Sequence, residues 1–139
     1  NLRAAEGCFC PCKQISIVKL TTDSDEITSS FVYVKLYVNG IAIFDARQVL
    51  DEEATVAIDQ DTPVFIDGLL GTDLKLEYNE EDYSSPDDSG FVTVPHATWY
   101  HKGCDTRYDD HPTTNGDNTG AWVFFIKVET APSGSCSSP

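Results

Sequence analysis

The sequence predicts an antiparallel all-β sandwich of about eight short strands. Apolar and polar residues alternate along several short runs, turn residues separate these runs, and no segment shows the period of a long helix. Hydrophobic residues make up 40% of the 139 residues, and many of them are β-branched or aromatic. This composition suits one sheet-rich domain with its own core.

The expected strands are separated by turn signals. Residues 31–38 alternate most clearly, with valine and leucine on one face and Tyr33, Lys35 and Tyr37 on the other. Asn39-Gly40 follows, and this pair predicts a type I′ hairpin turn because both positions need a positive φ. Residues 49–57 are also compatible with a helical turn, and 95–120 are expected to be irregular. The expected strands are 14–20, 31–38, 41–44, 54–58, 63–66, 74–79, 91–94 and 121–128.

The formal net charge of −14 excludes some classes of function. Nucleic-acid binding needs a basic surface, so it is not expected. Direct attraction to an anionic membrane is not expected either, unless a cation bridges the two surfaces. The acidic residues either keep the surface solvated or bind a cation.

A cluster of acidic residues follows the expected strand 74–79. Five of the nine residues from 80 to 88 are acidic. Such a loop is either solvated or neutralised by a hard cation such as Ca²⁺, which takes six to eight oxygen ligands. Strand alternation places Glu80 and Asp82 on one side, and Asp88 can return to them. Asp23 or Asp25, expected at the same end of the sandwich, can complete the site.

Two segments resemble the C2 domain, a family of eight-stranded Ca²⁺-binding sandwiches. Residues 23–40 are similar to the first calcium loop and its following strand, with Tyr33-Val34-Lys35 retained. The family's Asp-Pro is replaced here by Phe31-Val32, so one ligand is missing. Residues 76–94 are similar to the third loop, with Glu80, Asp82 and Asp88 at its ligand positions. The resemblance implies a C2-like fold and Ca²⁺ as the cofactor.

The five cysteines indicate an oxidising compartment. They are Cys8, Cys10, Cys12, Cys104 and Cys136. The N-terminal three are expected to reach different partners, two of which can be Cys104 and Cys136. One thiol is then free or bonded to another chain, and zinc is a weaker alternative. We expect an N-terminal cysteine-rich tail (1–13), a sandwich domain (14–130) and a C-terminal tail (131–139).

Other residues suggest further sites. His96, His101 and Cys104 are a weak transition-metal candidate. Trp99 and Tyr100, expected in a loop, are candidates for binding a partner or glycan. Three aspartates of the long loop offer a second cation site or a plain acidic surface: Asp109, Asp110 and Asp117.

No recognisable catalytic arrangement occurs in the sequence, so we do not expect an enzyme. The chain begins at Asn1 without an apolar signal region, and we expect a processed, secreted protein. The predicted function is an extracellular Ca²⁺-binding module that is structural, adhesive or self-assembling, for example as a filament subunit, and binds a second copy or a protein partner. The alternatives are Ca²⁺-dependent phospholipid binding and glycan or partner binding.

Overall fold

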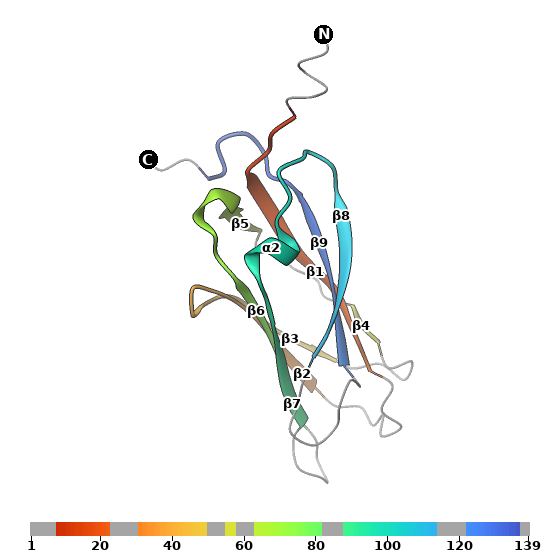
Figure 1. Cartoon of the computed structure of the whole chain (residues 1–139). Coiled ribbons are helices and arrows are strands. Elements are labelled where there is room, and N and C mark those ends of the chain that lie inside the picture. The colour runs from red at the N-terminus through yellow and green to blue at the C-terminus, as the bar shows by residue number, and fades with distance from the viewer. Residues whose placement is uncertain are drawn as a thin grey trace.

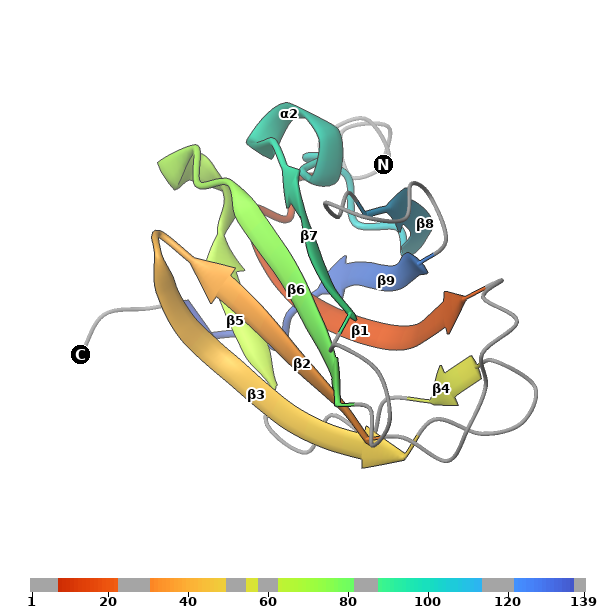
Figure 2. The same cartoon turned by 90° about the horizontal axis from the view of Figure 1, so that it is seen from below.

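The computed structural model describes residues 8–22, 31–49, 55–57, 63–81, 88–113 and 122–136. These residues form two antiparallel sheets that pack face to face (Figures 1 and 2). No helix within these ranges is long and apolar enough to cross a membrane.

The first sheet is built around β1 and has the order β4-β1-β9-β8, with β5 also paired to β1. β4 pairs with residues 19–21 and β5 with residues 12–15, so these two short strands share one edge of β1. The sheet therefore has four strand positions. Its strands are β1 (Cys12–Thr22), β4 (Thr55–Ala57), β5 (Val64–Asp67), β8 (Arg107–Pro112) and β9 (Trp122–Thr130).

The second sheet has the order β3-β2-β6-β7, and each pair is antiparallel. With four strand positions in each sheet, the prediction of an eight-stranded antiparallel sandwich is confirmed. The strands are β2 (Phe31–Val38), β3 (Ile41–Val49), β6 (Leu74–Glu81) and β7 (Asp88–Val94).

The core lies between the two sheets and follows from the alternation of apolar residues. In β2 the side chains of Val32, Val34 and Leu36 are fully buried, as the sequence predicts. β9 behaves in the same way, with Phe124 and Ile126 buried. Each such side chain contributes about 1.5–3 kcal/mol when it is removed from water, so the facing rows hold the sheets together.

The connection between β2 and β3 is the predicted hairpin turn. Asn39 has a φ of 53° and Gly40 a φ of 76°. Both central residues therefore adopt the positive φ that a type I′ turn requires. This turn fixes the register in which Val38 lies opposite Ile41.

Two elements replace part of the segment that was expected to be irregular. The short helix α2 (His96–Trp99) follows β7, and β8 pairs with β9 along the edge of the first sheet. The side chains of β8 are mostly exposed, so the strand lacks the apolar alternation that would reveal it in the sequence. The prediction of irregular structure was therefore wrong for these two elements.

Other boundaries differ in smaller ways. β1 begins at Cys12, so the expected end of the N-terminal tail at residue 13 falls inside this strand. Strands β3 and β4 cover both ends of the segment 49–57, for which a helical turn was the alternative. A single turn of 3₁₀ helix, η1 (Gly68–Leu70), links β5 to β6 and is capped by the side chain of Asp67.

Candidate functional site

The predicted acidic site lies at the end of the sandwich where β6 ends and β7 begins (lower part of Figure 1). The strand register places Glu80 directly opposite Asp88, and Phe31 opposite Glu81. The backbone therefore brings two of the five predicted ligands together from neighbouring strands. The side chains of Glu80 and Asp88 are outside what the structure describes.

The first sheet reaches the same end of the molecule. Thr22, the last residue of β1, lies opposite Trp122, the first residue of β9. The indole ring of Trp122 stacks on the ring of Tyr78 with centroids 4.5 Å apart. Because Tyr78 precedes Glu80 by two residues on β6, this contact places the end of β1 beside the acidic end of the second sheet.

The end of β8 is attached there too. The backbone N–H and the hydroxyl of Thr113 both donate to the carbonyl oxygen of Trp122, at 2.9 Å each. The described strands end and begin again four times at this end of the sandwich, on either side of segments 23–30, 50–54, 82–87 and 114–121. These segments contain Asp23, Asp25, Asp82 and Asp117, which lie outside the described residues.

The expected partner-binding platform is not formed by Trp99. Its side chain is only 1% exposed, and its indole N–H donates to the carbonyl oxygen of Thr72 at 2.9 Å. Tyr100 is partly buried against the core and stacks on His96 with ring centroids 4.8 Å apart. The prediction for Trp99 was wrong because α2 turns this ring inward, where its burial contributes to the core.

The weaker metal candidates do not converge in the described part of the chain. Nε2 of His96 contacts the carbonyl oxygen of Gly68, whereas Nε2 of His101 lies 3.0 Å from the carbonyl oxygen of Asp105. Asp109 and Asp110 are successive residues of β8, so they project to opposite faces of the strand. A shared site for either set is not supported by this geometry.

The cysteines gather at the opposite end of the sandwich. The sulfur atoms of Cys8, Cys10 and Cys104 all lie within 4.8 Å of one another. Cys12 is bonded to Cys136, and their Cα atoms are 5.8 Å apart. The backbone N–H of Cys10 donates to the carbonyl oxygen of Lys102 at 2.8 Å, which holds the N-terminal segment against the loop that carries Cys104.

A buried lysine lies beside this cluster. Lys13 is fully buried, and its Nζ donates to the carbonyl oxygen of Gly103 and lies 3.5 Å from Nε2 of His101. Burial lowers the pKa of Lys13, and the negative charge of Asp105 opposes this effect. A hydrogen bond from Arg107 in turn lowers the pKa of Asp105. No sequence signal points to this buried charge, because lysine is rarely fully buried.

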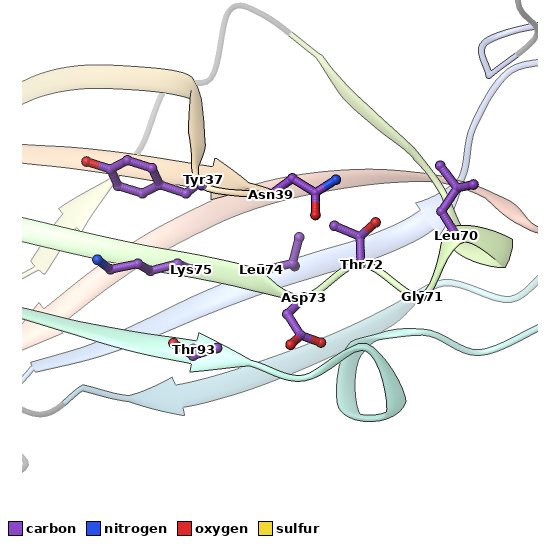
Figure 3. Close-up of a pocket in the computed structure, with 10 residues that line it drawn as sticks. Tyr37, Asn39, Leu70, Gly71, Thr72, Asp73, Leu74, Lys75 and Thr93 are labelled. Carbon is purple, nitrogen blue, oxygen red and sulfur yellow. The ribbon is translucent and has the colours of Figure 1, made fainter.

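A shallow pocket of about 550 Å³ lies near the β2–β3 turn (Figure 3). Its polar side chains are engaged with neighbouring groups: Asp73 accepts from the backbone N–H of His96, and Lys75 lies 3.6 Å from a carboxylate oxygen of Glu77. Nζ of Lys75 also lies 5.3 Å from the ring centroid of Tyr37. These contacts account for the charged groups without a ligand.

Comparison with known proteins identifies the fold. No family model and no curated protein sequence matches the chain. The structure is similar to a C2 domain of plant extended synaptotagmin 1, with a TM-score of 0.58 and 8% identity over 89% of this chain and 96% of that one.

Two further solved structures have the same architecture. A C2 domain-containing protein from a putative elicitor-responsive gene has a TM-score of 0.59 and 18% identity over 94% of this chain and 96% of that one. A structure of CC2D1B has a TM-score of 0.56 and 15% identity over 89% of this chain, which spans 56% of that protein. The two sheets, their strand order and these likenesses together show that the chain has a C2-like fold.

Proposed function

We propose that this chain is a Ca²⁺-binding module of the C2-like type. The observation that supports this most directly is the register of β6 and β7, which pairs Glu80 with Asp88 at the strand ends. Acidic residues directly opposite each other on neighbouring strands repel each other unless their carboxylates turn apart, are protonated or are bridged by a cation. Ca²⁺ is suited to bridging them because it takes six to eight oxygen ligands in flexible geometry.

The overall charge and one structural neighbour also support this proposal. The net charge of −14 favours binding of a divalent cation. A structure of human GIVD cytosolic phospholipase A2 in complex with an inhibitor and terbium chloride has a TM-score of 0.57 and 12% identity over 88% of this chain and 17% of that one. Terbium is a hard cation with the same preference for oxygen ligands.

Thermal unfolding of oxidised protein, with excess Ca²⁺ and with chelator, tests the proposal. Binding to the native state alone stabilises it by about 2.7 kcal/mol at a hundredfold excess over Kd, so Ca²⁺ should raise Tm. Glu80→Gln and Asp88→Asn should each reduce this rise. Glu129→Gln is the matched control, because Glu129 lies at the far end of β9 and is paired with Lys127.

The proposal fails if Ca²⁺ leaves the Tm of the wild-type protein unchanged. It also fails if Glu80→Gln and Glu129→Gln reduce the calcium-dependent rise by the same amount. Adding vesicles of anionic phospholipid to the same samples distinguishes a structural cation from one that bridges to a membrane. Calcium-dependent co-sedimentation with the vesicles would favour the membrane-binding alternative.

The cysteine cluster favours a second candidate function, an extracellular structural or adhesive subunit that bonds to another copy. The sulfur atoms of Cys8, Cys10 and Cys104 lie close together, and one disulfide among them leaves the third cysteine as a thiol. An intermolecular disulfide from this thiol would join two copies. Non-reducing gels and the mass in solution test this, and a protein that stays monomeric in both would exclude it. The glycan-binding alternative is weakened because Trp99 is buried.

A further inference from the structure

Cys104 lies within bonding range of two cysteines. Its Cα is 6.0 Å from that of Cys8 and 5.1 Å from that of Cys10. Both separations fall in the range of about 4.4–6.8 Å that disulfides occupy. A sulfur atom forms one disulfide at a time, so Cys104 can bond to either neighbour but not to both.

We infer that these three residues form a thiol–disulfide exchange site with Cys104 as the shared partner. In the exchange step, the thiolate of Cys8 attacks Sγ of Cys104 in the Cys10–Cys104 disulfide. A bond forms between Cys8 and Cys104, the Cys10–Cys104 bond breaks, and its electron pair leaves on the Cys10 sulfur as a thiolate. No net oxidation occurs, and the reverse step restores the first disulfide.

The two remaining cysteines, Cys12 and Cys136, do not take part in this exchange. Cys12 and Cys136 are bonded to each other. Two disulfides use four of the five cysteines, so the oxidised monomer has one remaining thiol. The exchange is independent of calcium binding, because the cysteines lie at the opposite end of the sandwich from Glu80 and Asp88.

Two hydrogen bonds hold the segments of the cluster together. The backbone of Cys10 is bonded to that of Lys102, and the ammonium of Lys13 is bonded to the carbonyl group of Gly103, which precedes Cys104. These contacts hold Cys10 against the loop that carries Cys104, so the N-terminal cysteines stay within reach of their shared partner.

The exchange also controls exposure of the remaining thiol. Cys8 is exposed, whereas Cys10 is partly buried. When Cys104 is bonded to Cys10, the thiol is on the exposed Cys8 and can attack an external disulfide. A low-molecular-weight disulfide such as glutathione disulfide would then form a mixed disulfide with Cys8 and release one thiolate. This reaction prevents further exchange of the Cys10–Cys104 disulfide, because the sulfur of Cys8 is no longer a thiol.

Counting the free thiols of the wild type, Cys8→Ser and Cys10→Ser tests whether Cys104 can bond to either Cys8 or Cys10. The monomeric fraction of each oxidised protein is denatured in acid with chelator, and its thiols are counted. We expect one thiol in the wild type and none in either Cys8→Ser or Cys10→Ser, because each variant keeps four cysteines in two disulfides. Two thiols in either variant would show that Cys104 accepts only one partner, and would overturn the inference. Circular dichroism checks that both variants are folded.

Labelling of the wild-type protein tests the exchange itself. Alkylation by N-ethylmaleimide after an acid quench, followed by fragmentation in a mass spectrometer, locates the thiol. We expect label on both Cys8 and Cys10, and a shift to a mixed disulfide on Cys8 after incubation with glutathione disulfide. Label on one residue alone before incubation, or a mixed disulfide found mainly on Cys10, would contradict the inference.

Discussion

The rings of Tyr78 and Trp122 stack across the sandwich, with centroids 4.5 Å apart and planes inclined by 22°. Tyr78 belongs to β6 of the second sheet, and Trp122 begins β9 of the first. Both side chains are almost fully buried. The pair therefore joins the two sheets near the end of β6, where Glu80 lies opposite Asp88.

Replacing Tyr78 with alanine should lower the free energy of unfolding by about 3–5 kcal/mol, because a buried aromatic ring is lost and a cavity remains. The matched control is Tyr108→Ala, since Tyr108 is 69% exposed on the edge strand β8. That variant should change stability by no more than about 0.5 kcal/mol. Urea unfolding of both variants under oxidising conditions measures the difference. Equal losses would contradict the role of Tyr78.

Much of the fold could be predicted because its inner strands carry a regular pattern. β2 alternates between buried valine or leucine and more exposed residues, and the Asn39-Gly40 turn follows from the φ values that each residue tolerates. β8 could not be predicted in this way. As an edge strand with exposed side chains, it is stabilised by hydrogen bonds to β9, and this leaves no periodic signal in its own residues.

The candidate sites were less predictable because they depend on contacts between distant segments. The acidic residues could be identified from the sequence, but the pairing of Glu80 with Asp88 depends on the register of β6 and β7. Trp99 was expected in a loop as part of the irregular segment 95–120, whereas α2 places it in the core. The convergence of three cysteines depends on the N-terminal segment lying against residues 102–104, and spacing along the chain does not show this.

Gly68 is tightly enclosed, and its replacement by alanine should destabilise the protein. A Cβ atom at this position would overlap the ring of Tyr100 and lie 2.9 Å from the carbonyl oxygen of Pro11. Overpacking of this kind costs about 1–3 kcal/mol. Chemical unfolding of Gly68→Ala measures the loss, and the double variant with Tyr100→Ala should show a smaller additional loss than the two single effects predict. Full additivity of the two substitutions would contradict a direct clash.

The disulfide between Cys12 and Cys136 should contribute more to the stability of the protein than the disulfide of Cys104. It links residues separated by 124 positions in the sequence. Removing a native disulfide from a small domain costs about 2–5 kcal/mol, so Cys136→Ser should unfold at a markedly lower denaturant concentration. Cys8→Ser is the control, because Cys10 can still bond to Cys104. If both variants lose the same stability, the Cys12–Cys136 bond does not have this role.

His111 should make the protein less stable in mild acid. Burial lowers the pKa of its imidazole, while the carboxylates of Asp109 and Asp110 oppose the shift. Its Nε2 is buried, and no hydrogen-bond partner for it is found among the described residues. The unfolded chain therefore binds the proton more readily than the folded one. The stability that comes from keeping His111 neutral is present above the ordinary pKa of about 6.5 and is lost as the pH falls through the folded value.

Urea unfolding of wild-type protein and His111→Gln, in chelator from about pH 7.5 to about pH 5, measures this contribution. The variant should lose less stability over this range, by no more than about 1 kcal/mol, because solvent screens a group that is only partly buried. Since both proteins keep all of their carboxylates, the difference between their curves isolates the imidazole. Parallel curves across the whole range would show that His111 is protonated equally readily in the folded and unfolded states.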